Sequence, residues 1–226
     1  MGLLDILLGR TKPVAPDLDQ LFALPSAALT LEAAAGFTPT GGGAVCFASV
    51  EGAAFEQTQR EVRALLDADA ERRPPGSRER GMESVGAPPV ELRQDDYGYS
   101  WLVSQRPPDQ LPDLVNDLHA VNSSMEVNGF GPQLLCSLVG FEHAEAAEHT
   151  GTVETVRGSD AGGRGRRLAL VYLYKRGTFY PFAPLPGAAQ RRDNALELQV
   201  KAALGNDLRI EPDLSRWFPV WGAPGL

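Results

Sequence analysis

The segment RLALVYLYKRGTFYPF, residues 167–182, decides the fold. Residues 168–174 are almost all apolar or aromatic and include the residue types that favour β-strands. Arg176-Gly177 predicts a turn, because glycine accepts the backbone angles that tight turns require. Residues 178–182 then return as a second strand. This segment therefore predicts an antiparallel hairpin, and it is the strongest strand signal in the chain.

Aromatic residues stand on both faces of this hairpin, and a soluble domain can bury only one of the two faces against its helices. We expect the outward set to meet solvent, the extended aromatic tail at 217–221, or a partner. Exposed aromatic and arginine side chains often anchor protein interfaces, and core packing is the alternative explanation for these residues. The candidate partner-binding residues are Tyr172, Tyr174, Lys175, Arg176, Tyr180, Trp217 and Trp221.

Outward from the hairpin, helical and strand patterns follow one another along the chain. Apolar spacing predicts helices at 17–24, 53–68, 109–128 and 193–205, and strands at 43–48, 90–93, 97–106 and 134–141. Residues 26–36 carry both helix and strand signals, and 38–43 is expected to be a loop. We expect Pro25 to end the first helix, because proline disrupts a helix interior.

This order predicts an α+β fold, with an antiparallel sheet of about five to six strands and helices packed on one face. The order is similar to that of secretion-chaperone or YbjN-like domains. The alternative is a ferredoxin-like βαββαβ core over 43–141, followed by a C-terminal hairpin and helix. Residues 69–88 and 142–166 are polar and predict mobile insertions. We expect an apolar segment and linker at 1–16 and a single domain at 17–226.

Charge and cysteine content narrow the range of functions. The chain has 226 residues and a formal net charge of −8, which argues against broad binding to nucleic acid, since phosphate contacts need a basic face. Cys46 and Cys136 lie in apolar runs and are expected to be buried, unpaired thiols of a reducing compartment. His143 and His149 fall in the second insertion, where exposed side chains are favoured over zinc ligands. We expect no metal and no cofactor.

The first ten residues, MGLLDILLGR, differ from the rest of the chain. Their aliphatic residues can form two helical turns with a wide apolar face. One interpretation is a helix docked on its own domain; the other is a peptide that binds a membrane surface or a partner. We expect a cytoplasmic location, with peripheral attachment at the inner face of the membrane as the second possibility. The aliphatic residues concerned are Leu3, Leu4, Ile6, Leu7 and Leu8.

Catalytic fingerprints are missing from the sequence. It contains no Gly-x-Ser-x-Gly elbow, no P-loop and no dinucleotide-binding motif. Asp95-Asp96 suits a hairpin turn better than an acid pair, because aspartate stabilises turns by hydrogen bonds to the backbone. His119 lies close to Ser123 and Ser124, but the sequence supplies neither an oxyanion site nor an orienting acid. We therefore expect no enzymatic activity.

Several long strings resemble the PspAB family of PspA-associated proteins, which are accessory components of actinobacterial phage-shock-type envelope-stress systems. The resemblance runs nearly end to end, and the two polar segments lie outside the matching strings. The strings are LGRTKP (8–13), LFALPSAALTL (21–31), YGYSWLV (97–103), DLHAVNSS (117–124), GFGPQLLCSLVGF (129–141), LALVYLYKRGTFYPFAP (168–184), RRDNALELQV (191–200) and EPDLSRWFPVWGAPGL (211–226).

This resemblance implies a cytoplasmic protein that works with PspA, a membrane-binding coiled-coil protein. It supplies no catalytic residues. The expected function is a non-enzymatic adaptor of the envelope-stress response that binds PspA or an associated component. A chaperone-like peptide-binding module is the alternative, and a hydrolase of unknown type is a further one. A fixed partner would favour the adaptor, and many weak peptide ligands would favour the chaperone-like module.

Overall fold

The computed structural model describes residues 16–49, 52, 55–58, 60, 61, 64, 90–143, 165–187 and 190–226. At its centre lies a six-stranded antiparallel sheet in the order β2-β3-β1-β4-β5-β6. The strands are β1 (Phe37–Ala48), β2 (Val90–Gln94), β3 (Tyr99–Gln105), β4 (Leu134–His143), β5 (Arg167–Leu173) and β6 (Thr178–Phe182).

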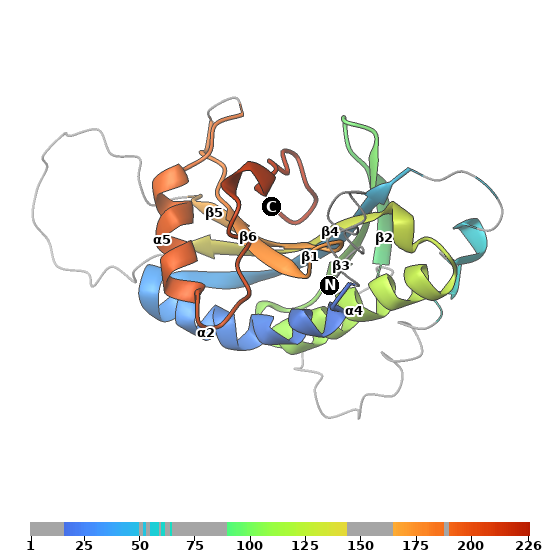
Figure 1. Cartoon of the computed structure of the whole chain (residues 1–226), viewed down its shortest axis with the longest axis horizontal. Helices are drawn as coiled ribbons and strands as arrows, with labels where there is room; N and C mark the ends of the chain where they lie inside the picture. Colours follow the sequence, from blue (N-terminus) through green and yellow to red (C-terminus); the bar gives the residue numbers. More distant parts are fainter. Residues whose placement is uncertain are drawn as a thin grey trace, which may run out of the picture.

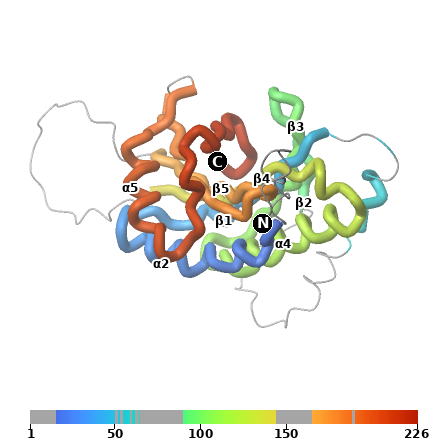
Figure 2. Tube along the Cα trace, viewed as in Figure 1, coloured from blue at the N-terminus to red at the C-terminus, as the bar shows by residue number. Residues whose placement is uncertain are grey.

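Helices and the C-terminal tail take opposite faces of the sheet. Helices α2 (Leu24–Ala35) and α4 (Leu111–Val127) cover one face, and the tail after Ile210 folds back over the other (Figure 1). Helix α5 (Asn194–Leu204) packs against β6 and α2, as the tube in Figure 2 also shows. Short 3₁₀ turns are η1 (Leu18–Ala23), η2 (Pro108–Gln110), η3 (Gly131–Gln133) and η4 (Leu214–Arg216).

The predicted α+β class, with an antiparallel sheet and helices on one face, is confirmed. Strands β1 and β2 each pair antiparallel with β3, so they run parallel to one another with β3 between them. Residues 55–58, which are helical, lie between β1 and β2 in sequence, and α4 joins β3 to β4. This split βαβ arrangement is that of the ferredoxin-like alternative, with β5 and β6 added as a hairpin at one edge.

Three local predictions were wrong. Pro25 does not end a helix but occupies the first turn of α2, where its missing N–H leaves no bond unmade. The expected loop at 38–43 belongs to β1, where Gly41, with φ +78°, sits in an irregular stretch of the ladder. Strand β4 extends to His143, whose ring meets Phe37 edge-on at 5.3 Å rather than lying in an exposed loop.

Two apolar cores sandwich the sheet. The larger one lies beneath α2 and α4, and the apolar stripe of α4 is buried in it. The smaller one lies on the opposite face, where the tail covers residues such as Val171, Tyr180 and Phe182. The stripe consists of Leu111, Leu114, Val115, Leu118, Val121 and Met125.

A buried ion pair fixes α4 to the end of β3. The Asp117 carboxylate accepts hydrogen bonds from Arg106 Nε at 2.6 Å, from Arg106 Nη2 at 2.7 Å and from Ser104 Oγ at 2.7 Å. The Asp117 and Arg106 side chains are only 3% and 11% exposed. A bidentate geometry of this kind supplies the partners that buried charges require.

Another buried carboxylate connects α5, β6 and the tail. Glu197 accepts from Arg192 Nε at 2.8 Å and from the Ala183 amide at 2.9 Å, while Arg192 Nη1 donates to the Trp217 carbonyl at 2.7 Å. Burial raises the pKa of the Glu197 carboxyl, although its hydrogen bonds act in the opposite direction. Arg192 therefore ties the tail to the domain at the start of its aromatic segment.

Within the described residues, no helix is both long and apolar enough to cross a membrane. The structure likewise places no group of three or more histidine, cysteine, aspartate or glutamate side chains for metal binding among those residues. The predicted insertion at 69–88 lies outside the described residues, as does 144–164 of the second insertion.

Candidate binding groove

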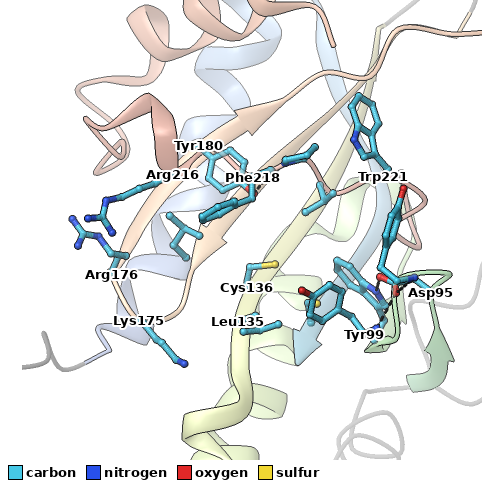
Figure 3. Close-up of a pocket in the computed structure, with 16 residues that line it drawn as sticks. Asp95, Tyr99, Leu135, Cys136, Lys175, Arg176, Tyr180, Arg216, Phe218 and Trp221 are labelled. Carbon is cyan, nitrogen blue, oxygen red and sulfur yellow. Dashed lines mark hydrogen bonds between the residues drawn. The ribbon is translucent and has the colours of Figure 1, made fainter. Parts of the chain in front are cut away.

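A cavity of about 560 Å³ opens on the sheet face opposite α2 and α4, where the tail leaves part of the sheet uncovered. We call it the groove. Its floor comes from the central strands, one wall from the β2–β3 turn, and the other from the β5–β6 turn and the tail (Figure 3). The volume falls in the ~300–1,000 Å³ range of ligand sites.

Strand register builds the floor of the groove. Cys46 on β1 lies opposite Trp101 on β3 and opposite Cys136 on β4, and Cys136 lies opposite Leu173 on β5. Directly opposed residues of adjacent strands point to the same face of a sheet. Trp101, Cys46, Cys136 and Leu173 therefore form one transverse row, and all four line the groove.

The β2–β3 turn supplies exposed aromatic rings. Asp95 accepts hydrogen bonds from the Tyr97 and Tyr99 amides, each at 2.9 Å, and from Trp101 Nε1 at 2.8 Å. These bonds hold the turn and occupy the carboxylate. Tyr97 and Tyr99 line the groove but remain 54% and 44% exposed. Exposed rings on a fixed turn are suited to contact with an apolar ligand, because little side-chain freedom is lost on binding.

The tail forms the opposite wall and is firmly anchored. Trp217 is buried, stacks on Tyr180 at a centroid distance of 6.1 Å, and donates from Nε1 to the Glu211 carbonyl at 3.0 Å. Tyr180 in turn donates its hydroxyl to the Phe218 carbonyl at 2.7 Å. Phe218 projects into the groove wall and is 60% exposed. The anchored neighbours thus present an exposed phenyl ring.

Cations gather at one end of the groove. Lys175, Arg176 and Arg216 line this end, and in Figure 3 they lie on the side away from Asp95. Arg176 pairs with Glu211 and Arg216 with Asp213, each at 3.1 Å. Lys175 is exposed and has no ion-pair partner among the described residues. This end therefore favours a ligand that carries a negative charge beside its apolar part.

Glu211 stabilises the base of the tail beside these cations. Burial raises the pKa of its carboxyl, but hydrogen bonds from Thr178, the Asp213 amide and Arg176 together outweigh burial. The pKa of Glu211 is therefore lowered from its usual 4.5. The carboxylate stays ionised at neutral pH and keeps the tail attached to the hairpin.

The two cysteines are unpaired and buried, as predicted. Their positions opposite one another were not foreseen, because they lie far apart in sequence. A hydrogen bond with Cys136, together with burial, raises the pKa of the Cys46 thiol. The Cys46 side chain therefore acts as a protonated apolar group at neutral pH, and both cysteine side chains form part of the floor.

The structure divides the candidate residues predicted from sequence between two faces. Lys175, Arg176, Tyr180 and Trp221 line the groove, and Trp217 supports its wall. Tyr172 and Tyr174 instead lie in the helix-side core and do not reach the groove. Burial raises the pKa of the Tyr174 hydroxyl to about 12. The aliphatic candidates Leu3, Leu4, Ile6, Leu7 and Leu8 lie outside the described residues.

Other groove residues were missed by the sequence prediction. In the strand predicted at 97–106, alternation puts Tyr97, Tyr99 and Trp101 on one face, but nothing in the sequence showed that this face stays partly open. Phe218 also lines the groove and was not named as a candidate. Its place in the sequence, between Trp217 and Pro219 in an aromatic tail, could have marked Phe218 as a candidate.

The polar cluster around His119 lies on the helix side of the molecule. His119 Nδ1 is 3.5 Å from Ser123 Oγ, and its Nε2 is 3.4 Å from the carboxylate of Asp19. Both distances exceed the ~2.6–3.2 Å of a hydrogen bond that transfers a proton in catalysis. The imidazole packs on Phe22 with a centroid distance of 4.8 Å. These contacts fit a structural role in attaching η1 to α4.

Comparison with known protein families gives a match over nearly the whole chain. The sequence model of the family described as PspA associated protein B matches residues 1–225. No curated protein and no solved structure is significantly similar to the chain. The family match covers the groove, the tail and the N-terminal segment together. The chain belongs to the PspA associated protein B family.

Proposed function

We propose that this chain is a non-enzymatic adaptor of a phage-shock-type envelope-stress response, and that it binds PspA or a component associated with PspA. The family description, PspA associated protein B, supports an association with PspA. We place this adaptor in the cytoplasm, where it would meet its partner at the inner face of the membrane. The groove is the site at which we propose that the partner binds.

The observation that carries this proposal is the set of exposed aromatic rings around an apolar floor. Tyr97, Tyr99 and Phe218 are each more than two-fifths exposed, yet they converge on one cavity. Large apolar residues that are exposed together mark binding sites more often than scattered single ones do. The carboxylate in the groove, Asp95, is engaged by two amides and an indole N–H, which suits a structural role.

Capture on immobilised full-length PspA tests the proposal. Phe218→Ser removes an exposed ring from the groove wall, and Lys175→Glu reverses the charge at its cationic end. We expect Phe218→Ser to reduce capture at least tenfold, since truncation of an aromatic anchor at an interface commonly costs about 2 kcal/mol or more, about a 30-fold change. We expect Lys175→Glu to reduce capture as well, because it would oppose a negative charge on the partner. Leu29→Ser is the matched control, because Leu29 is 70% exposed on α2, on the far side of the sheet.

Undiminished capture by folded Phe218→Ser and Lys175→Glu proteins would place the interface elsewhere. An equal loss of capture by the Leu29→Ser control would also argue against the groove, because Leu29 lies on the other side of the sheet. A chaperone-like module remains the second candidate, because the rim is rich in aromatic rings that accept many apolar ligands. Similar binding of unrelated apolar peptides, with no preference for PspA, would favour that candidate over an adaptor.

A further inference from the structure

We propose that the apolar segment at the start of this chain, residues 3–8, occupies the groove of its own molecule until a partner displaces it. This inference rests on the proposed function and describes how access to the same site is regulated. The segment reads LLDILL, five aliphatic residues around one aspartate. The argument depends on where the described chain begins, on the lining of the groove and on charge.

The described chain begins beside the cationic end of the groove. The Asp17 carbonyl accepts a hydrogen bond from the Tyr172 hydroxyl at 2.8 Å. A Cβ built on Gly177, in the β5–β6 turn, would lie 3.4 Å from the Asp17 side chain. Lys175 and Arg176 belong to the same turn and line the groove. The described chain therefore begins on the helix side of the sheet, beside the turn whose other residues line the groove.

The linker is long enough to reach from this point into the groove. Residues 9–15 are seven residues, which span at most about 23–25 Å when extended. The segment has to pass around the hairpin turn from one face of the sheet to the other, and packed layers on a sheet lie ~10 Å apart. Two layers that lie on opposite faces of one sheet are therefore roughly 20 Å apart, and the extended linker exceeds this distance.

The segment also matches the groove chemically. The floor row of Trp101, Cys46, Cys136 and Leu173 and the exposed ring of Phe218 are apolar, as are five of the six residues in 3–8. Burial of aliphatic side chains stabilises such a contact by roughly 25 cal/mol per Å² of apolar area removed from water.

Charge gives the segment a preferred placement. Asp5 is the acidic residue of the segment, and Lys175 at the rim carries a positive charge with no ion-pair partner among the described residues. The linker residues Arg10 and Lys12 have the same sign as that end of the groove. The complementarity therefore lies between Asp5 and Lys175, and it predicts that Asp5→Lys weakens docking.

Tethering makes this occupant effective even when its intrinsic affinity is low. A short linker gives the attached segment an effective concentration in the millimolar range. A free ligand must compete with it, so partner affinity falls by the ratio of that concentration to the segment's own dissociation constant. An intrinsic dissociation constant of ~100 μM would thus weaken partner binding about tenfold at ~1 mM effective concentration.

The test uses full-length proteins that differ only in residues 3–8. The serine variant replaces Leu3, Leu4, Ile6, Leu7 and Leu8 with serine, and Val14→Ser in the linker is its matched control. The probe is a synthetic peptide of residues 1–9 with an amidated C-terminus. Circular dichroism and thermal unfolding establish that both variants are folded.

Tryptophan fluorescence reads the occupancy of the groove. Of the chain's 3 tryptophans, Trp101 and Trp221 line the groove, and Trp217 supports its wall. We expect the peptide to change the emission of the serine variant saturably, and to bind the Val14→Ser control at least ten times more weakly. Phe218→Ser or Lys175→Glu, added to the serine variant, should each abolish the peptide response, and an Asp5→Lys peptide should bind more weakly.

Thiol labelling gives a second measurement. Cys46 and Cys136 lie on the groove floor, so we expect them to react about ten times faster in the serine variant than in the Val14→Ser control, and peptide should slow the reaction again. The absence of a saturable peptide response, or a response that survives both groove changes, would overturn the inference. So would a dimer that dissociates in the serine variant, or vesicle binding by residues 1–9 without peptide binding to the groove.

The outcomes also separate this inference from the proposed function. If PspA capture depends on Phe218 and Lys175 but the peptide does not bind, the adaptor proposal stands and the segment has another role. If the peptide binds the groove but PspA capture ignores both residues, the segment is the groove's occupant and the partner binds elsewhere.

Discussion

Replacing Trp217 tests whether the tail is a packed wall of the groove or a loose extension. The side chain is only 6% exposed, stacks on Tyr180 at 6.1 Å and donates to the Glu211 carbonyl at 3.0 Å. Trp217→Phe keeps an aromatic ring but leaves a buried carbonyl without its donor, which is expected to cost about 1–3 kcal/mol. Trp217→Ala also removes the stacked ring, and we expect a loss of about 3–5 kcal/mol in the free energy of unfolding.

Urea unfolding followed by far-UV circular dichroism measures both changes without relying on tryptophan emission. The alanine variant should also lose capture by PspA, because Phe218 and Val220 would no longer be held along the wall. Phe218→Ala is the matched control: its side chain is 60% exposed, so its stability should change by less than about 0.5 kcal/mol while capture still falls.

Two results would refute this reasoning. A stability loss below about 1 kcal/mol for Trp217→Ala would mean that the indole is not packed as described. A folded Trp217→Ala protein with full PspA capture would mean that the tail contributes nothing to the site. An equal loss for the phenylalanine and alanine variants would assign the whole effect to the hydrogen bond rather than to the ring.

Three further outcomes follow from buried polar groups and close backbone contacts. Asp117→Ala should lower the free energy of unfolding by about 3–5 kcal/mol, because it removes the buried carboxylate to which the Arg106 guanidinium donates two hydrogen bonds. Asp117→Leu combined with Arg106→Met should restore most of this stability, and equal losses for the two variants in a urea titration would contradict the reasoning. The folded-state pKa of Glu211 is lowered, so its ionised carboxylate stabilises the fold above pH ~4.5, and this stabilisation is lost as the pH falls through the lowered pKa. Glu211→Gln should therefore make the free energy of unfolding less dependent on pH in acid. An unchanged pH dependence in acid would refute the assignment. Gly140→Ala should loosen the end of the tail, because its Cβ would clash with the Gly225 carbonyl oxygen. Faster amide exchange at Ala223, Gly225 and Leu226 would show this, whereas unchanged exchange would argue against the contact.

The sequence predicted those elements whose pattern is local. Residues 168–174 are apolar along their length, the α4 stripe repeats at helical spacing, and both cysteines lie inside apolar runs. Alternation along β3 also puts Tyr99 and Trp101 on one side, and both line the groove. These predictions held because a residue's direction from a strand or helix depends on its immediate neighbours.

Where the signals conflicted, packing decided between them. Residues 26–36 carried signals of both helix and strand, and they are helical because Leu24, Ala27, Ala28 and Leu31 bury one face against the core. The glycine-rich stretch at 38–43 looked like a loop, yet pairing with β4 and β3 extends it as a strand. Tertiary contacts override weak local propensity in both cases.

The candidate site depended on contacts between segments that are distant in sequence. The sequence placed aromatics on both faces of the hairpin, but it did not show that Tyr172 would face the helices and Tyr180 the tail. The floor row arises because register sets Cys46 between Trp101 and Cys136, residues 55 and 90 positions away along the chain. Local periodicity fixes which residues share a face of one strand, whereas only strand register and the path of the tail determine which of those faces meet and which stay open.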